Sequence, residues 1–88
     1  MNYLLVRHRI EDYAKWRPFF DGDIPAQKKA GLKVLYVLRE DKDPNNLFIL
    51  FESEDLAKAR EFTESPDLRK TMEKAGVIDM PDIHFLRE

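Results

Sequence analysis

Two stretches in the middle of the chain, residues 32–38 and 47–51, carry large hydrophobic residues at odd and even positions alike. Successive side chains of a β-strand point to opposite faces of its sheet, so strands of this kind need cover on both faces. A chain of 88 residues leaves room for about two helical regions besides its strands, which can cover one face of a small sheet. We therefore expect a second copy of the chain to cover the other face.

The composition predicts one folded domain spanning residues 1–88 and excludes several classes of protein. No cysteine is present, which rules out disulfides, thiolate metal sites and cysteine nucleophiles and fits a reducing compartment. No stretch approaches the ~20 apolar residues of a membrane span, and the N-terminal apolar run is too short for a signal peptide. The net charge of -2, with both signs interspersed, offers no basic stripe for nucleic acid. We expect a cytoplasmic protein with neither membrane nor nucleic-acid partners.

The hydrophobic pattern predicts strands at residues 3–9, 32–39, 47–52 and 82–87. The second and third flank a loop of turn-forming residues, 40–46, and so form a β-hairpin. With a helical region after the first strand and another after the third, the order is βαββαβ. This order is typical of an α+β ferredoxin-like fold with an antiparallel sheet.

Short polar residues and prolines mark the predicted helical regions. Asp12 is expected to cap the first, in which Pro18 and Pro25 predict a kink or a break into two short helices. Ser53 is expected to cap the second, and the sequence Ser-Pro-Asp at 65–67 signals a further helix start. The regions are expected to end at two glycines in left-handed conformation, Gly31 and Gly76.

Folding the hairpin about its loop pairs residues whose numbers sum to roughly 85 and assigns the two faces. One face is then almost wholly apolar and is expected to meet the helices: Val34, Tyr36, Leu38, Leu47, Ile49 and Phe51. The other face has an apolar centre framed by charges, as protein interfaces do. We expect a homodimer through this second face, built by Leu35, Val37, Phe48, Leu50 and Leu5.

Segments spread over nearly the whole chain carry a resemblance: RHRIEDY at 7–13, Trp16, FD at 20–21, AGL at 30–32, DPN at 43–45, DLAKA at 55–59, SPDL at 65–68 and AGV at 75–77. In these segments the chain resembles small bacterial proteins of the dimeric α+β barrel superfamily. Within it, the chain looks most similar to an uncharacterised branch related to the antibiotic-biosynthesis monooxygenases and the stress-responsive barrel proteins. The resemblance implies two ferredoxin-like sheets paired face to face and, in members that are enzymes, a small-molecule cavity between sheet and helices.

The resemblance carries no catalytic mechanism to this chain. The Asn/Trp/Tyr/Arg constellation of the quinone-forming monooxygenases cannot be placed on it residue by residue. Haem-degrading members need a histidine in the second helical region, and residues 53–76 contain none. We therefore expect no haem and no other cofactor.

Four residues are candidates for a small-molecule site between the sheet and the first helix: His8, Trp16, Phe20 and Tyr36. Aromatic walls with a few polar groups are the usual makeup of such sites. His8 and Tyr36 are the candidate catalytic residues, since an imidazole can act as a general base near neutral pH. The alternative is ordinary core packing, which is the better explanation for Trp16 and Phe20 taken alone.

A metal site formed by His8 and His84 has little support, because two histidines without a third ligand are a weak signal. Three functions are weighed. The first, which we favour, is a non-catalytic dimer that binds a small apolar or aromatic molecule or supports a larger assembly. The second is a cofactor-independent oxygenase or cyclase acting on an aromatic or polyketide-like substrate. The third, an RNA-binding sheet, lacks the basic surround and the exposed aromatics that it needs.

Overall fold

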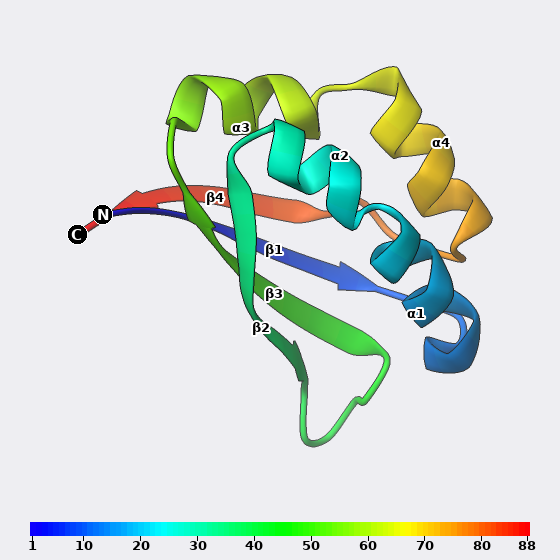
Figure 1. Ribbon diagram of the computed structural model, residues 1–88. Helices are drawn as coiled ribbons and strands as arrows, with labels where there is room; N and C mark the ends of the chain where they lie inside the picture. The colour runs from blue at the N-terminus through cyan, green and yellow to red at the C-terminus, as the bar shows by residue number, and fades with distance from the viewer.

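The computed structural model describes residues 1–88, which form four strands and four helices. Their order is β1 (Asn2–Arg9), α1 (Tyr13–Gly22), α2 (Ile24–Lys29), β2 (Leu32–Arg39), β3 (Asn46–Ser53), α3 (Leu56–Thr63), α4 (Pro66–Lys74) and β4 (Asp82–Arg87). The strands make one antiparallel sheet in the order β2-β3-β1-β4, and the helices all lie on one side of it (Figure 1). The predicted α+β ferredoxin-like fold is confirmed, with each helical region divided into two helices.

The first helical region breaks where the prolines indicated. Asp12 caps α1, its Oδ1 accepting from the backbone N–H of Ala14 at 3.1 Å. The chain leaves α1 at Asp23, and Pro25 lies in the first turn of α2, where a missing N–H costs nothing. Pro18 is accommodated inside α1. Both glycines expected at helix ends adopt positive φ, +74° at Gly31 and +85° at Gly76, which confirms that prediction.

The predicted cap at Ser53 is wrong. β3 continues through Ser53, which pairs with Asn2 and with Leu32 and is buried. The cap of α3 is instead Asp55, whose Oδ1 accepts from the backbone N–H of Ala57 at 2.8 Å. Two additional strand pairings outweigh an early cap, because they satisfy backbone groups that would otherwise be buried and unpaired. The cap predicted at residue 65, ahead of a proline, is confirmed.

A β-bulge in β2 overturns part of the predicted hairpin register. Val34 pairs with Phe51 as expected, but after one extra residue Tyr36 pairs with Leu50. Because side chains alternate, one inserted residue moves every later side chain of the strand to the opposite face. Val37 therefore faces the helices, while Tyr36 and Leu38, at 59% and 53% exposure, lie on the open side. The predicted faces of Tyr36, Val37 and Leu38 are wrong.

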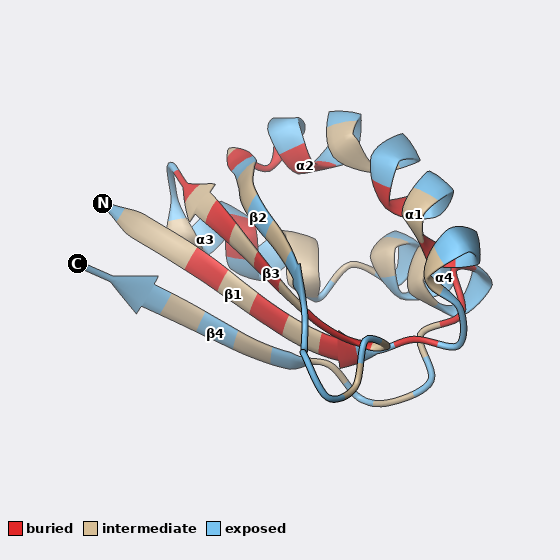
Figure 2. Ribbon diagram, turned by 90° about the horizontal axis from the view of Figure 1, so that it is seen from below, coloured by how far each residue is buried: buried red, intermediate tan, exposed pale blue.

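The core lies between the sheet and the helices, and β1 and β3 contribute five of its twelve buried apolar residues. Every second residue of β1 is buried, beginning with Leu4, and these residues alternate with partly exposed ones that face away from the helices (Figure 2). Trp16 stacks on Phe20 with ring centroids 4.8 Å apart, and Phe20 reaches Phe51 at 6.4 Å. Helix α1 is thus held on the sheet by aromatic packing.

No helix covers the other face of the sheet (Figure 2). Strand register places a group of apolar side chains on this open face: Tyr3, Leu5, Tyr36, Leu38, Phe48, Leu50 and Leu86. His84 lies among them, opposite Leu5. Leu5, Phe48 and Leu50 have the placement that was predicted for an interface.

Candidate functional site

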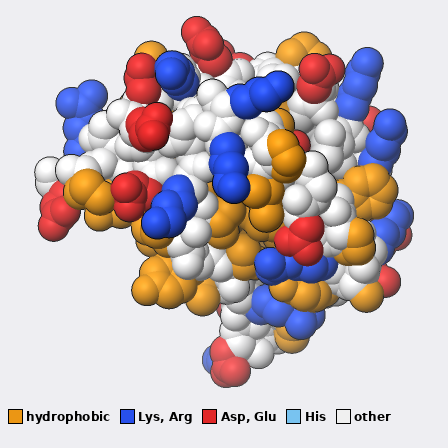
Figure 3. Space-filling view, viewed as in Figure 1, with side chains coloured by type: hydrophobic (Ala, Val, Ile, Leu, Met, Phe, Trp, Pro, Cys, Tyr) orange, Lys and Arg blue, Asp and Glu red, His pale blue; other side chains and the backbone are white.

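A cavity of about 490 Å³ lies between the inner face of the sheet and the helices. All four helices and the strands β1, β3 and β4 contribute to its walls, which are mostly hydrophobic. In the space-filling view, hydrophobic side chains reach the surface in the middle of the face and charged side chains surround them (Figure 3). Small-molecule sites in proteins have volumes of about 300–1,000 Å³ and apolar walls with few polar groups, so this cavity has the size and character of one.

Helix α4 covers the cavity without being anchored in the core. Leu68 and Met72 line the cavity, as do Arg69, Thr71 and Glu73. No residue of α4 is fully buried. In contrast to α4, helix α1 contributes two buried core residues, Trp16 and Phe20, to the cavity wall.

His8 lies in the cavity wall and has no hydrogen-bond partner. It occupies the inner face of β1 opposite Leu47, is 4% exposed, and leaves both ring nitrogens unpaired. The rings of His8 and Trp16 form an edge-to-face pair, with their centroids 5.8 Å apart. Burial lowers the pKa of His8 from 6.5 to about 4, against a smaller opposite effect of the Asp79 carboxylate. The imidazole is therefore neutral at physiological pH and presents one donor and one acceptor.

The structure brings three of the four predicted site residues together. His8, Trp16 and Phe20 all line the cavity. Trp16 and Phe20 are also part of the hydrophobic core, at 2% and 9% exposure. These two aromatic side chains therefore belong both to the cavity wall and to the hydrophobic core.

Tyr36 is not part of this site. The bulge in β2 turns it to the open face of the sheet, where it pairs with Leu50. Its predicted place beside His8 is wrong, because the assumed register carried no inserted residue. No residue of β2 marks the bulge, since the strand contains neither glycine nor proline.

Gln27 and Asp23 line the cavity as well, although neither is among the site residues predicted from the sequence. Gln27 is 2% exposed and its Oε1 has no partner. Burial raises the pKa of the half-buried Asp23, and a hydrogen bond with Gln27 partly offsets this. A signal existed: Gln27 continues the three-and-four spacing of Trp16, Phe20 and Ile24, so it is a polar residue on an apolar stripe.

His84 lies on the face of the sheet opposite to His8, since it pairs with Leu5 while His8 follows the parity of Leu4. The two imidazoles therefore cannot share a metal ion. No group of three or more His, Cys, Asp or Glu side chains is placed to hold one either. No helix has the length and apolar character needed to span a bilayer.

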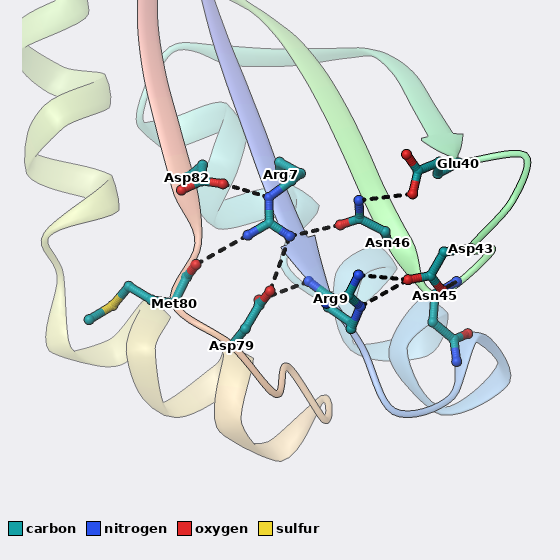
Figure 4. A network of polar contacts seen from close by, with 9 residues as sticks. All are labelled: Arg7, Arg9, Glu40, Asp43, Asn45, Asn46, Asp79, Met80 and Asp82. Carbon is teal, nitrogen blue, oxygen red and sulfur yellow. Dashed lines mark hydrogen bonds and ion pairs between the residues drawn. The ribbon is translucent and has the colours of Figure 1, made fainter.

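A polar network fixes the segment that precedes β4 at one end of the cavity (Figure 4). Arg7 donates to Asp82 at 2.6 Å, to Asn46 at 2.7 Å and to Asp79 at 3.1 Å. Asp79, which lines the cavity, also accepts from the backbone N–H of Arg9 at 2.9 Å. Burial acts to raise the pKa of Asp79, but these hydrogen bonds lower it below 3.8 overall. Asp79 is thus a charged group held in place from the open side of the sheet.

The sequence matches no protein-family model and no curated protein. Solved structures do match. A Bordetella bronchiseptica protein provisionally named an antibiotic biosynthesis monooxygenase superposes with a TM-score of 0.80 at 13% identity, over 99% of this chain and 95% of its own. A conserved Methanosarcina mazei protein gives 0.74 at 14% identity, over 99% and 91%. A Bacteroides thetaiotaomicron protein, also provisionally named such a monooxygenase, gives 0.67 at 22% identity, over 99% and 89%.

The chain has the fold of these proteins. This ferredoxin-like fold is the one that the resemblance in the sequence implied. At these identities the likeness concerns the fold, and one fold of this kind carries many unrelated activities. The chemistry of the site therefore has to be argued from its own residues.

Proposed function

We propose that the protein binds a small apolar or aromatic molecule in the cavity between sheet and helices, with His8 as a polar contact. One observation carries this proposal: His8 is buried, neutral and unpaired on both ring nitrogens in the wall of an apolar cavity. Trp16 and Phe20 supply the aromatic wall beside it.

The unpaired imidazole is costly to a protein that uses it only for packing. A buried polar group without a partner destabilises a fold by about 1–3 kcal/mol, whereas a leucine there would cost nothing of the kind. A hydroxyl or carbonyl group of a bound molecule would provide the missing partner. Trp16, Phe20 and the other apolar residues of the cavity wall would contact the rest of that molecule.

Calorimetric titration with 4-hydroxybiphenyl tests the proposal. Trp16 is the chain's single tryptophan and lines the cavity, so its emission reports whether the compound binds there. We expect His8→Leu to weaken binding about threefold to tenfold, as the loss of one hydrogen bond does. Tyr36→Phe is the matched control: it removes a polar group from the open face and should leave the affinity unchanged. Absence of binding to the wild-type protein, or equal binding by His8→Leu, would contradict the proposal.

A second candidate is a cofactor-independent oxygenase or cyclase acting on an aromatic or polyketide-like substrate. It is favoured by the provisional names of several fold neighbours and by the neutral His8, which is able to accept a proton. The purified, metal-free protein would then convert such a compound under air, with products identified by mass spectrometry. A binding protein returns its ligand unchanged.

We further propose that the protein is a homodimer, joined through the open face of the sheet. Support comes from the apolar side chains gathered there, among them Leu5, Phe48 and Leu50, which no helix of the same chain covers. A stable interface buries about 800 Å² per partner, which a four-stranded sheet can provide. Sedimentation as a monomer at micromolar concentration would refute this.

A further inference from the structure

A buried side chain with unpaired polar atoms lies at each of two ends of the cavity. His8 marks one end. Leu4, four residues earlier on β1, also lines the cavity, which therefore extends about 13 Å along the strand. Gln27 lies at the Leu4 end: it also borders a small pocket with Val34, and Val34 and Leu4 both pair with Phe51.

The two ends of the cavity require different hydrogen-bonding groups on a ligand. The Oε1 atom of Gln27 can only accept a hydrogen bond, so its partner has to be an O–H or N–H group. The neutral imidazole of His8 offers one donor and one acceptor and suits a hydroxyl or a carbonyl. Asp23 lines the cavity next to Gln27, and its carboxylate disfavours a negatively charged ligand at this end.

We propose that Gln27 determines specificity, so that the cavity selects a neutral, elongated molecule with a hydrogen-bond donor at the end away from His8. This inference rests on the proposed binding function and adds what the ligand has to carry. The wall between the two ends contains the apolar pair Val6 and Ile49, so the middle of the molecule is hydrocarbon.

Two compounds that differ by one hydroxyl test the inference: 4,4′-dihydroxybiphenyl and 4-hydroxybiphenyl, with affinities measured by calorimetry. We expect the wild-type protein to prefer the diol about fivefold to tenfold, because the second hydroxyl donates to a buried acceptor. Gln27→Met keeps the length of the side chain and removes the acceptor, so the preference should fall to about twofold or less. Ser53→Ala is the matched control, since Ser53 is another buried, unpaired oxygen but does not line the cavity.

The outcomes separate the inference from the proposed function. If the wild-type protein binds both compounds equally, or if the preference survives in Gln27→Met, the role of Gln27 is refuted while binding in the cavity stands. If neither compound binds the wild-type protein, both are refuted. A preference that Ser53→Ala also abolishes would likewise overturn the role of Gln27. The comparison of the two compounds on the wild-type protein needs no variant, so it decides even if Gln27→Met fails to fold.

Discussion

Replacing His8 with leucine should make the protein more stable and a poorer binder at the same time. A buried polar group without a partner, such as this imidazole, costs about 1–3 kcal/mol, and leucine removes that cost. Against this stands the edge contact with Trp16 at 5.8 Å, worth about 0.5–1.5 kcal/mol. The balance favours the variant by about 1 kcal/mol at neutral pH, which raises the melting temperature by about 4–8 °C in a domain of this size.

The stability advantage of His8→Leu over the wild-type protein should grow as the pH falls. In the unfolded chain His8 takes up a proton below pH 6.5, whereas in the folded protein its pKa is about 4. His8 therefore does not reduce stability by proton uptake above pH 6.5, but as the pH falls from 6.5 toward 4 the unfolded chain binds a proton that the folded protein does not, and the folded protein loses stability. The gap between the two values corresponds to at most about 3 kcal/mol. The leucine variant has no such group, so its stability should depend less on pH over this window.

Urea unfolding of both proteins at about pH 7 and about pH 4, at one protein concentration, measures these differences. Circular dichroism follows the fold, and the emission of Trp16 follows the cavity wall. A variant that is less stable than the wild type at neutral pH would show that His8 is a packing residue with satisfied nitrogens. Parallel losses of stability with falling pH would show that the His8 pKa is not depressed. Either result refutes the reasoning.

Three further perturbations test other parts of the structure. Leu50→Asp on the open face should give monomers or insoluble protein, as sedimentation would show, and an intact dimer would contradict the proposed interface. Gly31→Val should cost about 1 kcal/mol or more in urea unfolding, because φ is +74° and the new Cβ would lie 3.3 Å from the Cβ of Glu54; Gly22→Ala, with no atom near its new Cβ, is the control and should be neutral or stabilising. Arg7→Met should lower stability by about 1–2 kcal/mol, since it removes the hydrogen bonds that Arg7 donates to Asp82, Asn46 and Asp79, and an unchanged unfolding midpoint would count against the network.

The parts of the fold that depend on local chemistry could be predicted from the sequence. Asp12 has a capping side chain, Pro25 cannot continue a helix, and the glycine at 31 tolerates a positive φ that other residues resist. The β2 register could not be predicted, because no glycine or proline in the strand marks the bulge before Tyr36.

In the candidate site, too, some residues could be predicted from the sequence and others could not. His8 was found because its strand parity follows from the pattern of β1. Gln27 could not be assigned to the site from the sequence, because a polar residue on an apolar helix stripe is a candidate for ligand binding only once it is known to line a cavity. Tyr36 was misplaced by a single inserted residue.

Helix α4 has a consequence for the way in which the proposed ligand would enter. It closes one side of the cavity, yet none of its residues is fully buried, so little holds it to the rest of the molecule. The free energy of local opening follows buried contacts. The amide hydrogens of α4 should therefore exchange with solvent well before those of β1 and β3, where the core residues are concentrated. Transient release of this helix would give a molecule its route inward, and the molecule once inside would supply the helix with the contacts that it otherwise lacks.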